Sequence, residues 1–167
     1  MRAAISPRRQ PGPALILAGD ALAIFGLFAP WYRLYTTFGD APGEHLDGPW
    51  TVLRESATGP STEAPFAVCF GILVFLPVAA LVASSVASLF VRAPRDGAAL
   101  ALLALPLAIG CLAVAIGVLI ITPQSLPLSW PYYTIRGVEY GAWAAVAGFV
   151  CVALGLVVQL FADWRRR

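Results

Sequence analysis

The stretch Pro13 to Tyr32, PALILAGDALAIFGLFAPWY, decides the fold of this 167-residue chain. Its length matches the ~20 apolar residues that an α-helix needs to cross the ~30 Å hydrocarbon core of a bilayer. Arginines precede it, and Pro30, Trp31 and Tyr32 close it. Asp20 would interrupt the ~7–15-residue apolar core of a secretory signal, which disfavours that alternative. The stretch therefore predicts a first transmembrane helix over residues 13–32.

The composition extends this prediction to the whole chain. Hydrophobic residues make up 59% of the sequence and charged residues only 12%, which excludes an ordinary soluble globular domain. Three further apolar runs predict crossings over residues 64–91, 98–122 and 140–162. The expected fold is all-α, a single transmembrane domain over residues 1–167 built as a four-helix bundle.

Two longer connections lie between these helices, over residues 33–63 and 123–139. The first is rich in Gly and Pro, which favours a mostly irregular loop. One short helix is expected within it, opening at Gly48-Pro49 with Asp47 as its cap and with Trp50 and Leu53 on one side. The connection between the second and third helices is a tight turn.

The arginines predict the orientation of the bundle. Arginine supplies all eleven basic residues, and eight lie in the two tails and the short turn: Arg2, Arg8, Arg9, Arg92, Arg95, Arg165, Arg166 and Arg167. Arg33, Arg54 and Arg136 fall in the long connections. Because basic residues stay on the cytoplasmic side, both termini are expected in the cytoplasm. The absence of lysine, together with abundant Ala, Gly and Pro, suggests a high-GC bacterial genome and hence the bacterial inner membrane.

Aromatic residues gather at the predicted outer interface, as in the belts that anchor transmembrane helices. The set comprises Trp31, Tyr32, Trp50, Trp130, Tyr132, Tyr133 and Trp143. Anchoring accounts for such a belt, and binding of a lipid, a glycan or a partner protein is the alternative. The bilayer is the first expected partner, followed by another membrane protein or a second copy of the chain. A net charge of +2 without a basic stripe predicts no nucleic-acid partner.

One polar cluster is expected inside the membrane. Asp20 lies ~10 Å from the inner end of its helix by helical rise, and Ser84 and Ser85 lie at the same depth in the second helix. Gln159 in the fourth helix is a third candidate neighbour. A charged acid costs ~2.5–3.5 kcal/mol at the bilayer centre, so Asp20 needs polar partners. The cluster either fastens the helices together or forms a proton- or cation-coupled site.

Several function classes are excluded by residue usage. The three cysteines lie apart within apolar runs, which disfavours a disulfide, a redox pair or a zinc site. A single histidine, His45, cannot supply a bis-histidine haem or an H-E-x-x-H zinc site, and a chain without lysine has no P-loop. No enzymatic activity, cofactor or metal is therefore predicted.

The chain resembles a group of small four-helix bacterial membrane proteins of unknown function. The resemblance rests on the arginine-rich start, the helix exit Leu27-Phe28-Ala29-Pro30-Trp31-Tyr32, the Trp-bearing outer loop and the helix start Tyr140-Gly141-Ala142-Trp143. It implies an architecture and no activity. The chain also resembles the small multidrug-resistance exporters, which have four helices and a single acid in the first one. In those exporters the acid is normally Glu, the chains are shorter and the loops are brief.

Two functional hypotheses follow. The first is a non-enzymatic accessory or structural subunit of an envelope or membrane complex, suggested by the lack of any catalytic set and by faces of small residues. The second is a small proton- or cation-coupled transporter that uses Asp20. A cavity beside Asp20 favours the transporter, and a closed contact with Ser84 or Ser85 favours the structural role.

Overall fold

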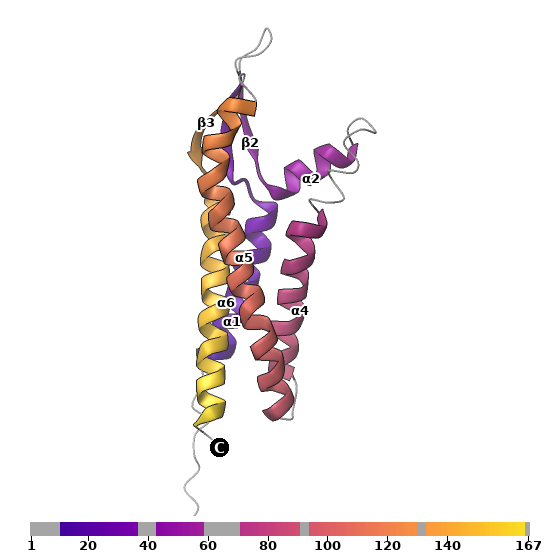
Figure 1. Cartoon of the computed structure of the whole chain (residues 1–167), viewed down its shortest axis with the longest axis vertical. Helices are drawn as coiled ribbons and strands as arrows, with labels where there is room; N and C mark the ends of the chain where they lie inside the picture. Colours follow the sequence, from indigo (N-terminus) through magenta and orange to yellow (C-terminus); the bar gives the residue numbers. More distant parts are fainter. Residues whose placement is uncertain (1–10, 37–42, 59–70, 91–93, 130–132, 166–167) are drawn as a thin grey trace, which may run out of the picture.

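The computed structural model describes residues 11–36, 43–58, 71–90, 94–129 and 133–165. Its elements in chain order are α1 (Pro11–Phe28), β1 (Tyr32–Thr36), β2 (Gly43–Asp47), α2 (Pro49–Thr58), the π-helical turn η1 (Gly71–Phe75), α4 (Leu76–Phe90), α5 (Pro94–Ser129), β3 (Tyr133–Val138) and α6 (Tyr140–Trp164). The long helices run side by side along the longest axis, with the strands at one end, the sheet end (Figure 1). The C-terminal end of α6 marks the opposite end.

Among the described residues, four helices are long and apolar enough to span a membrane: Pro11–Phe28, Ile72–Phe90, Gly97–Ile120 and Tyr140–Ala162. The prediction of four such helices is confirmed. Three predicted boundaries were wrong. α5 begins at Pro94, within the predicted turn and before the predicted start at residue 98, because proline suits the first position of a helix. α1 ends at Phe28 because Pro30 has no N–H with which to continue the helical ladder. α5 continues to Ser129 and covers part of the predicted 123–139 loop, since a helix does not need to stop where its side chains become polar. Residues 64–70 of the second predicted helix lie outside the described residues.

A small sheet corrects the all-α prediction. β1 is the middle strand of the order β2-β1-β3 and is antiparallel to both neighbours, so Tyr32 pairs with Asp47 on one side and Val138 on the other. β1 and β3 contain the aromatic and β-branched residues that favour strands, but they are far apart in sequence and pair only once α1 and α6 lie together. The short helix expected at Gly48-Pro49 is present as α2.

α1 and α6 form the closest helix pair of the bundle. Glycines make this approach possible, because a Cβ added at Gly19 would lie 2.7 Å from the carbonyl oxygen of Gly148, and one at Gly148 would lie 2.7 Å from that of Gly19. A Cβ at Gly26 would lie 2.6 Å from the Cβ of Ala145. The backbones are therefore in direct contact over the length of α1, the mode of packing that small residues allow between helices in lipid.

The remaining helices pack around this pair less closely. α5 packs against α6, α4 packs against α5, and the contact between α1 and α4 is much smaller. Buried residues from all four helices form one core, which includes Ile16, Leu81, Ala104 and Val152. The contact between α1 and α4 is therefore the smallest among these helix pairs, and it includes the polar side chains described below.

Candidate functional site

Among the acids whose burial the structure describes, Asp20 is the buried one, with 4% of its surface exposed. It follows Gly19, which packs against α6, so the carboxyl group reaches the adjoining side of α1 and meets α4. There the Ser85 hydroxyl donates a hydrogen bond of 2.7 Å to Asp20 Oδ2. The structure thus brings together the acid and one of the two serines that depth alone had placed at the same level.

Ser85 serves Asp20 in either protonation state. Its hydroxyl oxygen lies 2.7 Å from Asp20 Oδ2 and 3.1 Å from the carbonyl oxygen of Val82, yet it has one hydrogen to donate. When Asp20 is ionised, that hydrogen bonds the carboxylate. When Asp20 is protonated, the acid donates to Ser85 and Ser85 donates to Val82. The contact therefore needs no cationic partner, and within the described residues Asp20 forms no ion pair.

The polar contacts continue along α4 toward the end opposite the sheet. Ser88 Oγ donates to the Ser85 carbonyl oxygen at 2.6 Å, and Gln159 Nε2 of α6 donates to the Ser88 carbonyl oxygen at 3.4 Å. Asp20, Ser85, Ser88 and Gln159 therefore connect α1, α4 and α6. We call these four residues the polar ladder.

The polar ladder differs from the predicted cluster in one member, because it contains Ser88 in place of Ser84. Ser84 donates to the Leu81 carbonyl oxygen in its own helix, and this is the hydrogen bond that the structure shows for it. Ser88 takes its place, and it was missed although its spacing from Ser85 puts it one turn along the same face. Helical periodicity applied to Ser85 would have found Ser88.

Two acceptors of the polar ladder remain without a partner among the described residues. They are Asp20 Oδ1 and Gln159 Oε1, both buried. Buried polar atoms are nearly always hydrogen-bonded, so each of these oxygens has capacity for one more donor. A purely structural role does not require these two unpaired acceptors.

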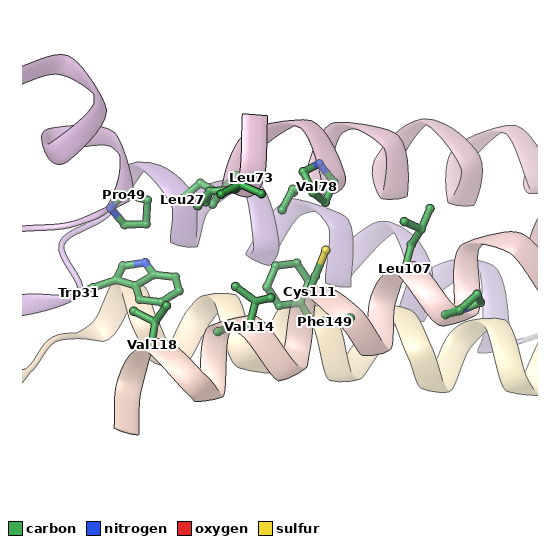
Figure 2. Close-up of a pocket in the computed structure, with 15 residues that line it drawn as sticks. Leu27, Trp31, Pro49, Leu73, Val78, Leu107, Cys111, Val114, Val118 and Phe149 are labelled. Carbon is green, nitrogen blue, oxygen red and sulfur yellow. The ribbon is translucent and has the colours of Figure 1, made fainter. Parts of the chain in front are cut away.

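A separate cavity of about 320 Å³ lies nearer the sheet end, between η1–α4 and α5 (Figure 2). Leu27, Trp31 and Phe149 close it from the side of α1 and α6, and Pro49 at the start of α2 lies over it. Its lining is apolar and does not include Asp20. The acid is thus held in a closed contact away from the open space of the bundle.

The predicted aromatic belt is divided by the structure. Trp31 and Tyr32 are buried: Trp31 Nε1 donates to the Gly26 carbonyl oxygen at 2.6 Å, and the Tyr32 hydroxyl donates to the Val118 carbonyl oxygen at 2.9 Å. Trp50 and Trp143 are exposed, and Trp50 also packs against Phe28 and Phe75.

The other three members of that set are Trp130, Tyr132 and Tyr133. Tyr133 begins β3, where it pairs with Thr36. Trp130 and Tyr132 lie outside the described residues. Of the four side chains that the structure places, two therefore face inward and fasten the sheet end of the bundle.

Comparisons with known proteins identify no relative. No protein-family model matches the chain, and neither a curated protein nor a solved structure does. The four long apolar helices indicate a multi-pass membrane protein.

Proposed function

We propose that this protein is a non-enzymatic, accessory or structural subunit of a membrane complex. The observation that carries the proposal is the closed contact between Asp20 and Ser85, which lies apart from the cavity. A carrier that couples flux to an acid must expose that acid in turn to each side of the membrane. Here the carboxyl group is buried and joins α1 to α4 through a hydrogen bond, as expected for a side chain that stabilises helix packing.

The orientation belongs to the same proposal. Eight of the eleven arginines lie in the two tails, just before α5 or in its first turn, so we place both termini in the cytoplasm and the sheet end outside the bacterial inner membrane. The sheet and α2 would then form an outer platform for a partner. Membership of the group of small four-helix bacterial membrane proteins fits this arrangement.

A small proton- or cation-coupled transporter is the second candidate. Asp20 Oδ1 favours it, because a buried carboxyl oxygen without a protein donor can bind a proton or a cation. The ability of Ser85 to serve both protonation states fits the same role.

Asp20→Asn separates the two candidates, since asparagine retains the shape and can accept the hydrogen bond from Ser85 but cannot ionise. For the accessory role we expect a pull-down from native membranes, after crosslinking in mild detergent, to recover the same partner with Asp20→Asn as with the unchanged protein. Ser84→Ala is the matched control, because Ser84 bonds only within its own helix.

Two results would reject the accessory role. One is a strictly solitary monomer in the crosslinked membranes. The other is a proton-linked flux in liposomes that Asp20→Asn abolishes while circular dichroism shows an intact fold. The second result would establish the transporter in its place.

A further inference from the structure

The cavity between η1–α4 and α5 has the properties of a hydrocarbon site. Its volume of about 320 Å³ falls within the range of ligand pockets, roughly 300–1,000 Å³. Such pockets normally contain a few polar groups that orient a ligand. None of the described residues that line the cavity has a charged side chain, and the indole N–H of Trp31 is already bonded to Gly26. The site is therefore complementary to an apolar chain and not to a polar solute.

The sequence explains why the helices part at this level. Pro77 of α4 and Pro106 of α5 both line the cavity, and each proline removes a backbone donor and disturbs the preceding turn. The π-helical turn η1 ends just before Pro77. Gly110 leaves further room, because a Cβ added there would meet nothing within 4 Å. Two prolines and one glycine thus create a space that side chains do not fill.

The mouth of the cavity opens at the depth of the lipid tails. Leu73 and Val114 line it and remain 70% and 53% exposed. Both belong to segments that are apolar enough to cross the membrane, Ile72–Phe90 and Gly97–Ile120. The surroundings of the mouth in a bilayer are therefore hydrocarbon, and Figure 2 shows Leu73 and Val114 on opposite walls.

We propose that an acyl chain of a bilayer phospholipid enters between α4 and α5 and occupies this cavity. The cavity reaches inward to Phe149 of α6, past two helices that pack against each other. A partner helix about 10–12 Å wide is too thick to follow that path, whereas a chain of single methylenes is not. The inference rests on the membrane setting of the four helices and is independent of the accessory role.

Quenching of Trp31 fluorescence by brominated lipid tests the proposal. The full chain, with Trp50→Phe, Trp130→Phe, Trp143→Phe and Trp164→Phe, retains Trp31 as its single tryptophan. It is reconstituted into nanodiscs of phosphatidylcholine brominated at mid-chain. Trp31 lines the cavity but is only 5% exposed, so lipid on the outer surface makes little contact with it. We expect strong quenching relative to unbrominated lipid.

Filling the cavity should remove this quenching. Gly110→Leu fills it from α5, and Val74→Phe fills it independently from η1 if the first variant does not fold. Gly117→Leu is the matched control, because a Cβ at Gly117 also meets nothing within 4 Å but this residue does not line the cavity. Loss of quenching in the filled variants, with quenching kept in Gly117→Leu, supports the proposal.

Three results would overturn it. Trp31 could remain unquenched in the unfilled protein, or quenching could persist after the cavity is filled. A fall in the mass of the nanodisc-borne protein from dimer to monomer on Gly110→Leu would assign the cavity to a second copy of the chain. Because none of these readouts uses a partner protein, they are separate from the pull-down that tests the accessory role.

Discussion

The two halves of the bundle are packed in opposite ways. α1 and α6 meet backbone to backbone through glycines, and a Cβ added at Gly19 or Gly148 would collide with the facing helix. α4 and α5 contain Pro77 and Pro106 at their contact and leave a cavity of about 320 Å³. A Cβ added at Gly110 of α5, which lines that cavity, would meet no atom within 4 Å. Glycine therefore closes one helix pair and leaves space in the other.

The difference has a physical cause in the solvent. Lipid tails are as apolar as the helices, so burial of apolar surface does not drive the helices together, and close packing and hydrogen bonds must do so. α1 and α6 use close packing, reinforced where the Gly141 N–H donates to the Pro30 carbonyl oxygen at 3.0 Å and the Glu139 N–H donates to the Trp31 carbonyl oxygen at 2.8 Å. α4 packs mainly against α5 and is joined to α1 by the hydrogen bond between Ser85 and Asp20. The two helix pairs are therefore joined to each other partly through the polar ladder.

Gly19→Ala should have the largest effect on stability. The added Cβ would lie 2.7 Å from the Gly148 carbonyl oxygen and the Val152 nitrogen, which are backbone atoms that cannot move aside. We expect a loss of about 3 kcal/mol, the upper end of the usual cost of overpacking. Denaturation in SDS followed by circular dichroism measures it. Gly117→Ala is the control and should be neutral or slightly stabilising, since alanine favours helix over glycine. Equal losses in the two variants would contradict the contrast between the halves.

This contrast was partly visible in the sequence. Glycines recur every seven residues at Gly12, Gly19 and Gly26 and again at Gly141, Gly148 and Gly155. Such a repeat predicts one continuous face on each helix. Helical periodicity places these glycines on one face of each helix, but it does not say which helix that face meets. The pairing of Gly19 with Gly148 therefore required coordinates.

The polar ladder was predictable to a similar degree. Helical rise placed Asp20 and Ser85 at one depth, but depth does not give rotation about the helix axis, so it could not choose Ser85 over Ser84. The sheet was not predicted, because β1 and β3 are separated by about a hundred residues and neither is stable without the other. The local sequence therefore predicted the membrane-spanning helices. It could not predict the contacts between segments that are far apart in the chain.

Trp31→Phe should have the second-largest effect. Pro30 lacks the N–H that would bond the Gly26 carbonyl oxygen in a helix, and the Trp31 indole supplies that bond at 2.6 Å. Phenylalanine retains most of the ring but not the donor. We expect a loss of about 2 kcal/mol, because a buried acceptor is left unpaired. SDS denaturation measures it, and Trp143→Phe, at a position 61% exposed, is the control. An unchanged stability in Trp31→Phe would mean that the carbonyl group finds another donor.

The hydrogen bond between Asp20 of α1 and Ser85 of α4 should contribute less to stability than the contacts of Gly19 and Trp31. A double-mutant cycle of Asp20→Ala and Ser85→Ala, each of which removes one partner, measures the coupling across the hydrogen bond between α1 and α4. We expect about 0.6 kcal/mol and at most about 1.7 kcal/mol, the average and the maximum found for hydrogen bonds between helices in a membrane protein. The same cycle with Ser84→Ala should give no coupling, since Ser84 bonds within α4. Equal coupling to both serines would indicate that α4 is held by its overall packing and not by this contact.

The smallest effect is expected at the surface of the sheet end. Arg33 Nε donates to Glu139 Oε1 at 2.8 Å, joining β1 to the residue before α6, and the Arg33 side chain is 46% exposed. An exposed ion pair contributes at most about 1 kcal/mol, so Glu139→Gln should lower stability by less than that and the loss should shrink in high salt. Glu44→Gln is the control, because Glu44 lies 3.9 Å from the same guanidinium and is itself half exposed. A large, salt-independent loss in Glu139→Gln would show that the sheet, and not the glycine contact alone, holds α1 and α6 together.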